Sequence, residues 1–158
     1  MSVHVIVLAA GQGSRMKSDL PKVLHPLSGK PLLQHVLDTV EKLNVDGIHV
    51  VVGHQSEKVK DTIGNTNINW CYQAEQLGTG HAVAQAINEI PQESTVLILY
   101  GDVPLTRKAT LTKLISTVSS DQLALLTVFL ENPMGYGRII RDEDDSILAI
   151  VEEKDANE

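Results

Sequence analysis

Near its start the sequence has a glycine-rich segment whose residue types suit phosphate binding. Gly11 and Gly13 directly follow an apolar run, and glycines let the backbone turn sharply and approach a ligand closely. Backbone N–H groups in such a turn can surround phosphate oxygens, and Ser14 adds a hydroxyl donor. Arg15 supplies a planar guanidinium and Lys22 a mobile positive charge, which both suit phosphate. The alternative is a plain tight turn in a solvated basic loop, and two glycines do not decide between them.

The spacing excludes two common nucleotide-binding motifs. Met16 stands where G-x-G-x-x-G requires its third glycine. The second predicted strand ends in Gly53 rather than in the acidic residue that would hold a ribose. The segment also lacks the G-x-x-x-x-G-K-[ST] pattern of a Walker loop. Phosphate binding here would therefore depend on a different loop type.

A second loop has groups that could recognise a base. Gln73 carries an amide that can donate and accept hydrogen bonds at once, which suits a pyrimidine edge. Gly78 and Gly80 would bring the backbone close to a ligand, and Thr79 could cap the following helix or contact a ligand. An ordinary entry from a loop into a helix explains the same residues equally well.

A third loop places an acidic side chain after an apolar segment. Asp102 follows Val96–Tyr100, and a carboxylate at such a strand end could hold Mg²⁺ between phosphates. Magnesium commonly takes only one or two protein carboxylates, so a single aspartate suffices. Alternatively, Asp102 only organises the turn before Pro104.

Two hydrophobic periodicities alternate along the chain and predict the elements that position these loops. The expected strands cover residues 5–10, 48–52, 68–73, 96–100 and 123–130, and the expected helices cover 32–43, a short stretch after Ser56, 82–90, and 106–118, where Thr106 is the expected N-cap. We expect residues 96–100 to form the best buried strand. Residues 136–141 and 146–153 predict a terminal hairpin, with Glu152 and Glu153 facing opposite sides.

This order predicts an α/β, Rossmann-like fold with a mostly parallel sheet, helices on both faces and a C-terminal β-hairpin. Ligands of such sheets bind at the carboxyl ends of the strands. The three loops that follow Ala10, Gln73 and Tyr100 are therefore expected to meet around one ligand.

Composition limits the class of protein further. The 158 residues are 42% hydrophobic and carry a net charge of −7, which argues against nucleic acid or an anionic membrane as partner. Residues 1–30 carry a net charge of +3, which favours a small anionic ligand, although a solvated basic loop is the plainer explanation. The sequence shows neither a membrane span nor a signal peptide, so we expect a reducing, cytoplasmic location. Cys71 is the single cysteine, which makes a disulfide impossible and a cysteine-based metal site unexpected.

Several segments together resemble a known family. Leu8–Met16 (LAAGQGSRM) and Leu20–Leu24 (LPKVL) are similar to the signature of sugar-phosphate nucleotidyltransferases. Ser18–His25 (SDLPKVLH) and Gln76–His81 (QLGTGH) resemble one branch, the N-terminal uridylyltransferase (pyrophosphorylase) domain of the bacterial bifunctional N-acetylglucosamine-1-phosphate uridylyltransferase / glucosamine-1-phosphate N-acetyltransferase. The resemblance extends from Val5 to Ala156.

The resemblance implies transfer of UMP from UTP to N-acetyl-α-D-glucosamine 1-phosphate, which yields UDP-N-acetylglucosamine, a cell-envelope precursor, and pyrophosphate. It implies the nucleotide-diphospho-sugar transferase fold, Mg²⁺ held by Asp102, and catalytic roles for Arg15 and Lys22. The substrate-binding residues implied by the match are Leu8, Ala9, Ala10, Gly11, Lys22, Gln73, Gly78, Thr79, Tyr100, Gly101, Asp102, Gly137 and Glu152.

The match also departs from the family pattern. In the family, the nucleotidyltransferase domain continues past residue 158 and includes a second, asparagine metal ligand, and a left-handed β-helix performs acetyl transfer. We therefore expect residues 1–158 to be a single, C-terminally incomplete domain without acetyltransferase activity. Two alternatives stay open, namely a sibling enzyme that uses another sugar 1-phosphate and a nucleotide-binding module without turnover.

Overall fold

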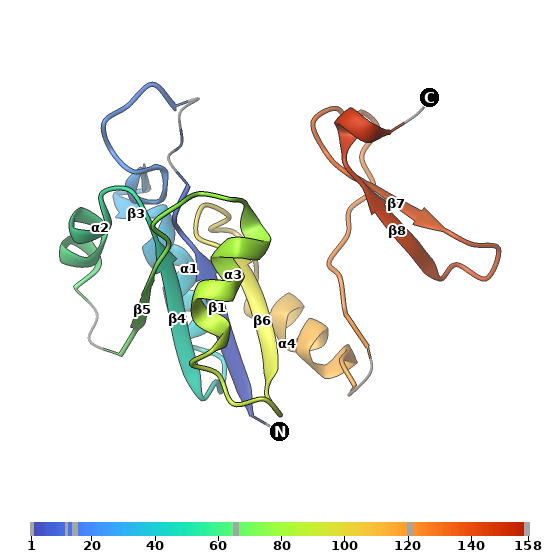
Figure 1. Cartoon of the computed structure of the whole chain (residues 1–158), viewed down its shortest axis with the longest axis horizontal. Coiled ribbons are helices and arrows are strands. Elements are labelled where there is room, and N and C mark those ends of the chain that lie inside the picture. Colours follow the sequence, from blue (N-terminus) through green and yellow to red (C-terminus); the bar gives the residue numbers. More distant parts are fainter. Residues whose placement is uncertain (1, 12, 14–15, 65–66, 120–121, 157–158) are drawn as a thin grey trace. The chain divides into compact units, whose positions relative to one another are not determined.

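The chain forms two compact units, Met1–Ala124 and Leu125–Glu158. The computed structural model describes residues 2–156 except residues 12, 14–15, 65–66 and 120–121. The first unit contains the predicted strand–helix alternation, and the second contains the predicted hairpin (Figure 1).

A four-stranded parallel sheet is the centre of the first unit. Its order is β5-β4-β1-β6, and its strands are β1 (Val3–Leu8), β4 (Gly47–Val52), β5 (Asn69–Tyr72) and β6 (Thr95–Tyr100). The central strand β1 pairs in parallel with β4 on one side and with β6 on the other. This arrangement confirms the predicted mostly parallel sheet.

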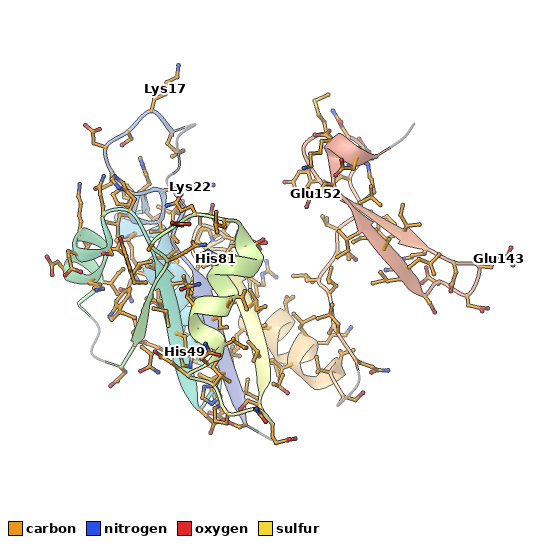
Figure 2. All side chains as sticks on the ribbon, viewed as in Figure 1. Lys17, Lys22, His49, His81, Glu143 and Glu152 are labelled. Atoms are coloured by element: carbon orange, nitrogen blue, oxygen red, sulfur yellow. The ribbon has the colours of Figure 1, made fainter. Side chains whose placement is uncertain are left out.

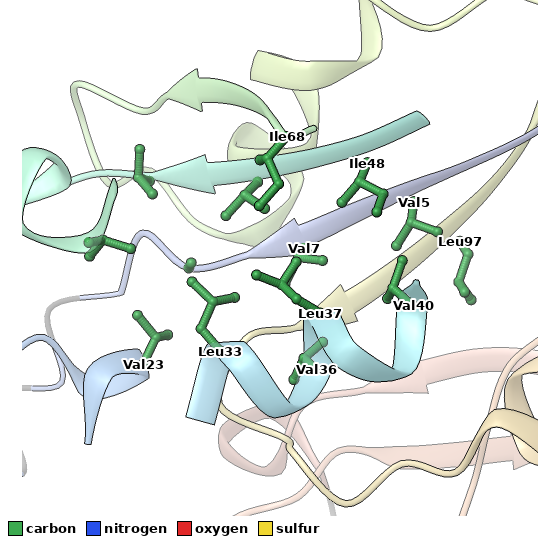
Figure 3. Close-up of a cluster of buried hydrophobic side chains, with 14 of the residues drawn as sticks. Val5, Val7, Val23, Leu33, Val36, Leu37, Val40, Ile48, Ile68 and Leu97 are labelled. Carbon is green, nitrogen blue, oxygen red and sulfur yellow. The ribbon is translucent and has the colours of Figure 1, made fainter. Parts of the chain in front are cut away.

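The larger hydrophobic core lies on one face of this sheet, beneath α1 (Leu32–Val40) (Figure 3). Leu33, Leu37 and Val40 of α1 recur with helical spacing, and all three are fully buried. They pack with Val5 and Val7 of β1, together with residues of α2 (Ser56–Ile63) and α4 (Lys108–Thr117). Burial of each such side chain contributes about 2 kcal/mol, so the positions of the strand ends are well fixed.

A smaller core lies on the opposite face, which α3 (Thr79–Ile87) covers. Ala82 and Ala86 of α3 pack against Ile6 of β1 and Val51 of β4. The small alanine side chains allow the helix to approach the sheet closely. Helices therefore cover both faces, as the alternating pattern predicted.

Three expectations about individual elements were wrong. Strand β6 is not the best buried strand, because it lies at the edge of the sheet, where Ile98 and Tyr100 are 45% and 52% exposed. Thr106 does not cap a helix, since α4 begins at Lys108 and no side chain caps it. Residues 123–130 form no strand in the part of the chain that the structure describes, because no described strand pairs with them.

The second unit contains the antiparallel hairpin β7 (Arg138–Arg141) and β8 (Ile147–Val151). Asp142 organises its turn by accepting hydrogen bonds from the backbone N–H groups of Asp144 and Ser146. The predicted alternation of Glu152 and Glu153 was wrong, because β8 ends at Val151 and the 3-10 helix η3 (Glu153–Asp155) follows, leaving both carboxylates exposed.

None of the helices in the described residues has both the length and the apolar character needed to cross a membrane.

Candidate functional site

Three turns leave the carboxyl end of the parallel sheet side by side. The backbone N–H of Ala9 donates to Val51, that of Gln73 donates to Val52, and that of Gly101 donates to Leu8, with N···O distances of 2.8, 2.8 and 2.9 Å. These bonds continue the strand ladder into the turns. The loops that the sequence placed after three separate strands therefore begin at adjacent positions, where parallel sheets usually bind ligands.

The three turns line one cavity of about 300 Å³, which we call the strand-end cavity. This volume is at the lower end of the range for small-molecule sites. The lining residues are Leu8, Ala9, Ala10, Gly11, Lys22, Val23, Gln73, Gln76, Gly78, Thr79, Ala82, Tyr100 and Asp102. The structure thus brings together most of the residues that the sequence singled out for substrate binding.

Lys22 and Asp102 form an ion pair in the lining of this cavity. Their side chains are 43% and 23% exposed, so both charges stay accessible to a ligand. Lys22 begins the short 3-10 helix η2 (Lys22–Leu24), in which Val23 and Leu24 are buried. The buried neighbours fix the backbone of Lys22, while its side chain lines the cavity. A small hairpin of β2 (Pro26–Leu27) and β3 (Lys30–Pro31) follows this helix.

Gly13 allows the first loop to pass close to Lys22. Its φ is +62°, and a Cβ atom added to it would lie 2.7 Å from the Cβ of Lys22. Any other residue would therefore be strained and would also clash with the lysine. The glycine predicted to bring the loop close to a ligand also brings it close to the cation.

Asp102 suits a hard divalent cation. Its carboxylate lines the cavity on the same side as Lys22, and carboxylate oxygen is the ligand type that Mg²⁺ prefers. A cation bound there would have to share or replace the contact with the Lys22 ammonium. The remaining coordination positions would be left for water and phosphate oxygens, as is common for Mg²⁺.

Two glutamine side chains hold the second loop in place through hydrogen bonds. Gln73 is buried, and its amide nitrogen donates to the carbonyl of Gly78 and to Nδ1 of His81. Gln76 donates to the carbonyl of Ala10 at 2.7 Å and so links the second loop to the first. The sequence pattern predicts no role for Gln76, although this residue begins the QLGTGH motif. A contact with a residue 66 positions away leaves no local pattern in the sequence.

Four predicted site residues are not among the described residues that line the cavity. Gly101 is buried, and a Cβ atom added to it would come within 3.2 Å of Leu33, Leu8 and Val23. Gly137 and Glu152 belong to the second unit. Arg15 lies outside the described residues. The site roles of these four residues therefore stay predictions.

The sequence is similar to those of several bacterial proteins. It is 56% identical over 154 residues to the bifunctional protein GlmU of Marinobacter nauticus, a match that covers 98% of this chain and 34% of that protein. The bifunctional protein GlmU of Pseudomonas savastanoi is 53% identical over 158 residues, or 100% of this chain and 34% of that protein. The chain thus spans about a third of the length of these relatives.

Solved structures share the fold. HddC from Yersinia pseudotuberculosis superposes with a TM-score of 0.77 at 27% identity, over 94% of this chain and 68% of that one, and HddC has also been solved in complex with GMP-PN. The complex of Rv0371C from Mycobacterium tuberculosis with manganese superposes with a TM-score of 0.63 at 21% identity, over 73% of this chain and 59% of that one.

The model of one domain family, the MobA-like NTP transferase domain, matches residues 5–144. The matched region includes the sheet and all three turns around the strand-end cavity. This chain therefore belongs to the MobA-like NTP transferase domain family.

Proposed function

We propose that this chain binds UTP in the strand-end cavity and transfers UMP to N-acetyl-α-D-glucosamine 1-phosphate, which yields UDP-N-acetylglucosamine and pyrophosphate. The observation that carries this proposal is the shared cavity, in which a glycine loop, Lys22 and Asp102 meet a buried glutamine amide. The 53–56% identity to GlmU proteins supports this choice within the nucleotidyltransferase family.

The first loop and Lys22 would hold the phosphates. Backbone N–H groups near Gly11 can donate to phosphate oxygens, and the Lys22 ammonium can neutralise charge near the α-phosphate. Arg15 would hold the leaving pyrophosphate. Because Lys22 pairs with Asp102, binding of the triphosphate would exchange a carboxylate partner for a phosphate partner.

The second loop would recognise uracil. Gln73 uses its amide nitrogen within the loop, which fixes its orientation and leaves its carbonyl oxygen to accept from a base. Gly78 would present its backbone to the base. Thr79 is proposed to lie near the sugar, and Tyr100 and Gly101 to contact the substrate. The resemblance implies Gly137 and Glu152 as contacts of the amino sugar.

Asp102 would hold the metal ion. A bound Mg²⁺ would neutralise triphosphate charge. A related structure with the same fold contains manganese, which supports a divalent cation in this family.

The proposed reaction needs no general base. The attacking phosphate oxygen is already anionic, so the residues of the cavity only have to align it with the α-phosphorus and neutralise charge. This requirement agrees with a site that contains a cation, a carboxylate and backbone donors rather than a nucleophile paired with a base.

A pyrophosphate-release assay tests the proposal. The chain would be mixed with UTP, Mg²⁺ and a panel of sugar 1-phosphates, with CTP, GTP and ATP in place of UTP as controls. We expect release with UTP and N-acetylglucosamine 1-phosphate. Release with another sugar would indicate a sibling enzyme. Absence of release, with UTP binding seen by calorimetry, would indicate a binding module and would contradict the proposed turnover.

A further inference from the structure

A second group of polar side chains lies on the face of the same sheet that α3 covers. It consists of His4 of β1, His49 of β4, Cys71 of β5 and Glu89, which follows α3, and we call it the α3-face cluster. Cys71 belongs to the core that α3 covers. Figure 2 shows His49 well apart from Lys22 along the strands. None of the four residues is among the described residues that line the strand-end cavity, so the cluster is separate from it.

Three atoms of this cluster have the spacing of metal ligands. Nδ1 of His49 lies 3.7 Å from Oε2 of Glu89, and Sγ of Cys71 lies 4.0 Å from the same oxygen. All three atoms are within 4.8 Å of one another. In a tetrahedral zinc site, ligand atoms of these types are about 3.3 to 3.7 Å apart. Movements of side chains by less than about an ångström would complete the geometry.

His49 directs an unpaired nitrogen into this group. The residue is only 1% exposed, and its Nδ1 has no hydrogen-bond partner among the described residues. Its other nitrogen, Nε2, is 3.1 Å from Nδ1 of His4. When Nε2–H donates to His4, Nδ1 keeps its lone pair for a cation. Histidine ligands of metals are usually held in this way through their second nitrogen.

We propose that His49, Cys71 and Glu89 bind a divalent cation of borderline softness, such as Zn²⁺. One sulfur, one nitrogen and one oxygen ligand match this class of ion and not Mg²⁺. Such an ion would join β4, β5 and the segment that follows α3. Because Glu89 is 55% exposed, the ion can enter from solvent, and water can take a fourth position.

Cobalt spectroscopy tests this proposal directly. Co²⁺ would be added to the 158-residue chain with excess Mg²⁺ present to fill the carboxylate site at Asp102. We expect a sulfur-to-cobalt charge-transfer band, which can arise only from Cys71 because the chain has one cysteine. Zn²⁺ should displace the cobalt. At 100 times its Kd, Zn²⁺ should also raise the melting temperature by about 5 to 10 °C.

Three variants assign the ligands. Glu89→Gln changes an exposed side chain and should weaken metal binding by about 100-fold or more, because loss of an outer partner alone costs 10 to 100-fold. Glu93→Gln, a matched change at a nearby exposed glutamate, should leave binding unchanged. Cys71→Ser should abolish the band, with native circular dichroism as the check on folding. Absence of the band in the folded wild-type chain, or an unchanged affinity in Glu89→Gln, would overturn the proposal.

Discussion

The strand-end cavity and the α3-face cluster carry polar groups of different kinds. In the lining of the cavity, Lys22 and Asp102 stay partly exposed. In the α3-face cluster, His49 and Cys71 are buried, and Glu89 is exposed to solvent. The cavity therefore suits a ligand that enters and leaves, whereas the cluster suits a small ion held within the fold.

The largest expected effect concerns the carboxyl end. Lys22→Ala should lower the rate of pyrophosphate release by about 100-fold or more, because one preorganised donor to the transition state contributes on this scale. Lys30→Ala is the matched control, since Lys30 pairs with Asp38 outside the cavity, and it should keep the wild-type rate. An unaffected rate in Lys22→Ala would remove Lys22 from the mechanism.

The next effect concerns the α3-face cluster without metal. The pKa of Cys71 is raised to about 11 from an ordinary value of 9.0, so the folded state disfavours the thiolate. The free energy of unfolding should be constant below about pH 9 and should then fall by about 2 kcal/mol as pH rises to about 11. Urea titrations across this range would show the loss, and Cys71→Ser should remove it. An unchanged profile in that variant would contradict the assignment to Cys71.

A smaller effect separates two glycines of the first loop. Gly13→Ala should lower the free energy of unfolding by about 1 to 3 kcal/mol, because the position has positive φ and faces the Cβ of Lys22. Gly11→Ala should have little effect on stability, because a Cβ there meets no atom within 4 Å. Urea denaturation of both variants measures the difference. Equal losses would contradict the close approach of this loop to Lys22.

The same comparison shows which site residues could be predicted from the sequence. The carboxyl-end residues lie in short motifs directly after apolar strands, and parallel strands bring such loops together, so the cavity could be predicted. His49, Cys71 and Glu89 come from separate elements with no motif among them. Only the strand register and the position of α3 bring these three residues together, and periodicity determines neither.

The wrong predictions about the fold have a similar origin. The apolar runs at 96–100 and 123–130 have strand composition, but burial and pairing depend on neighbours that a single segment does not specify. Strand β6 is an edge strand, and the second run has no described partner. In contrast, α1 agrees with its pattern because its apolar face is set by residues within the helix itself.

Nuclear magnetic resonance of the ¹⁵N-labelled chain tests the central claim, that three turns form one nucleotide site. During titration with UTP and Mg²⁺, we expect the amides of Gly11, Gln73, Gly78 and Asp102 to shift together with a single Kd, while those of His4 and His49 stay unchanged. Shifts confined to one turn, or centred on the α3-face cluster, would contradict the account.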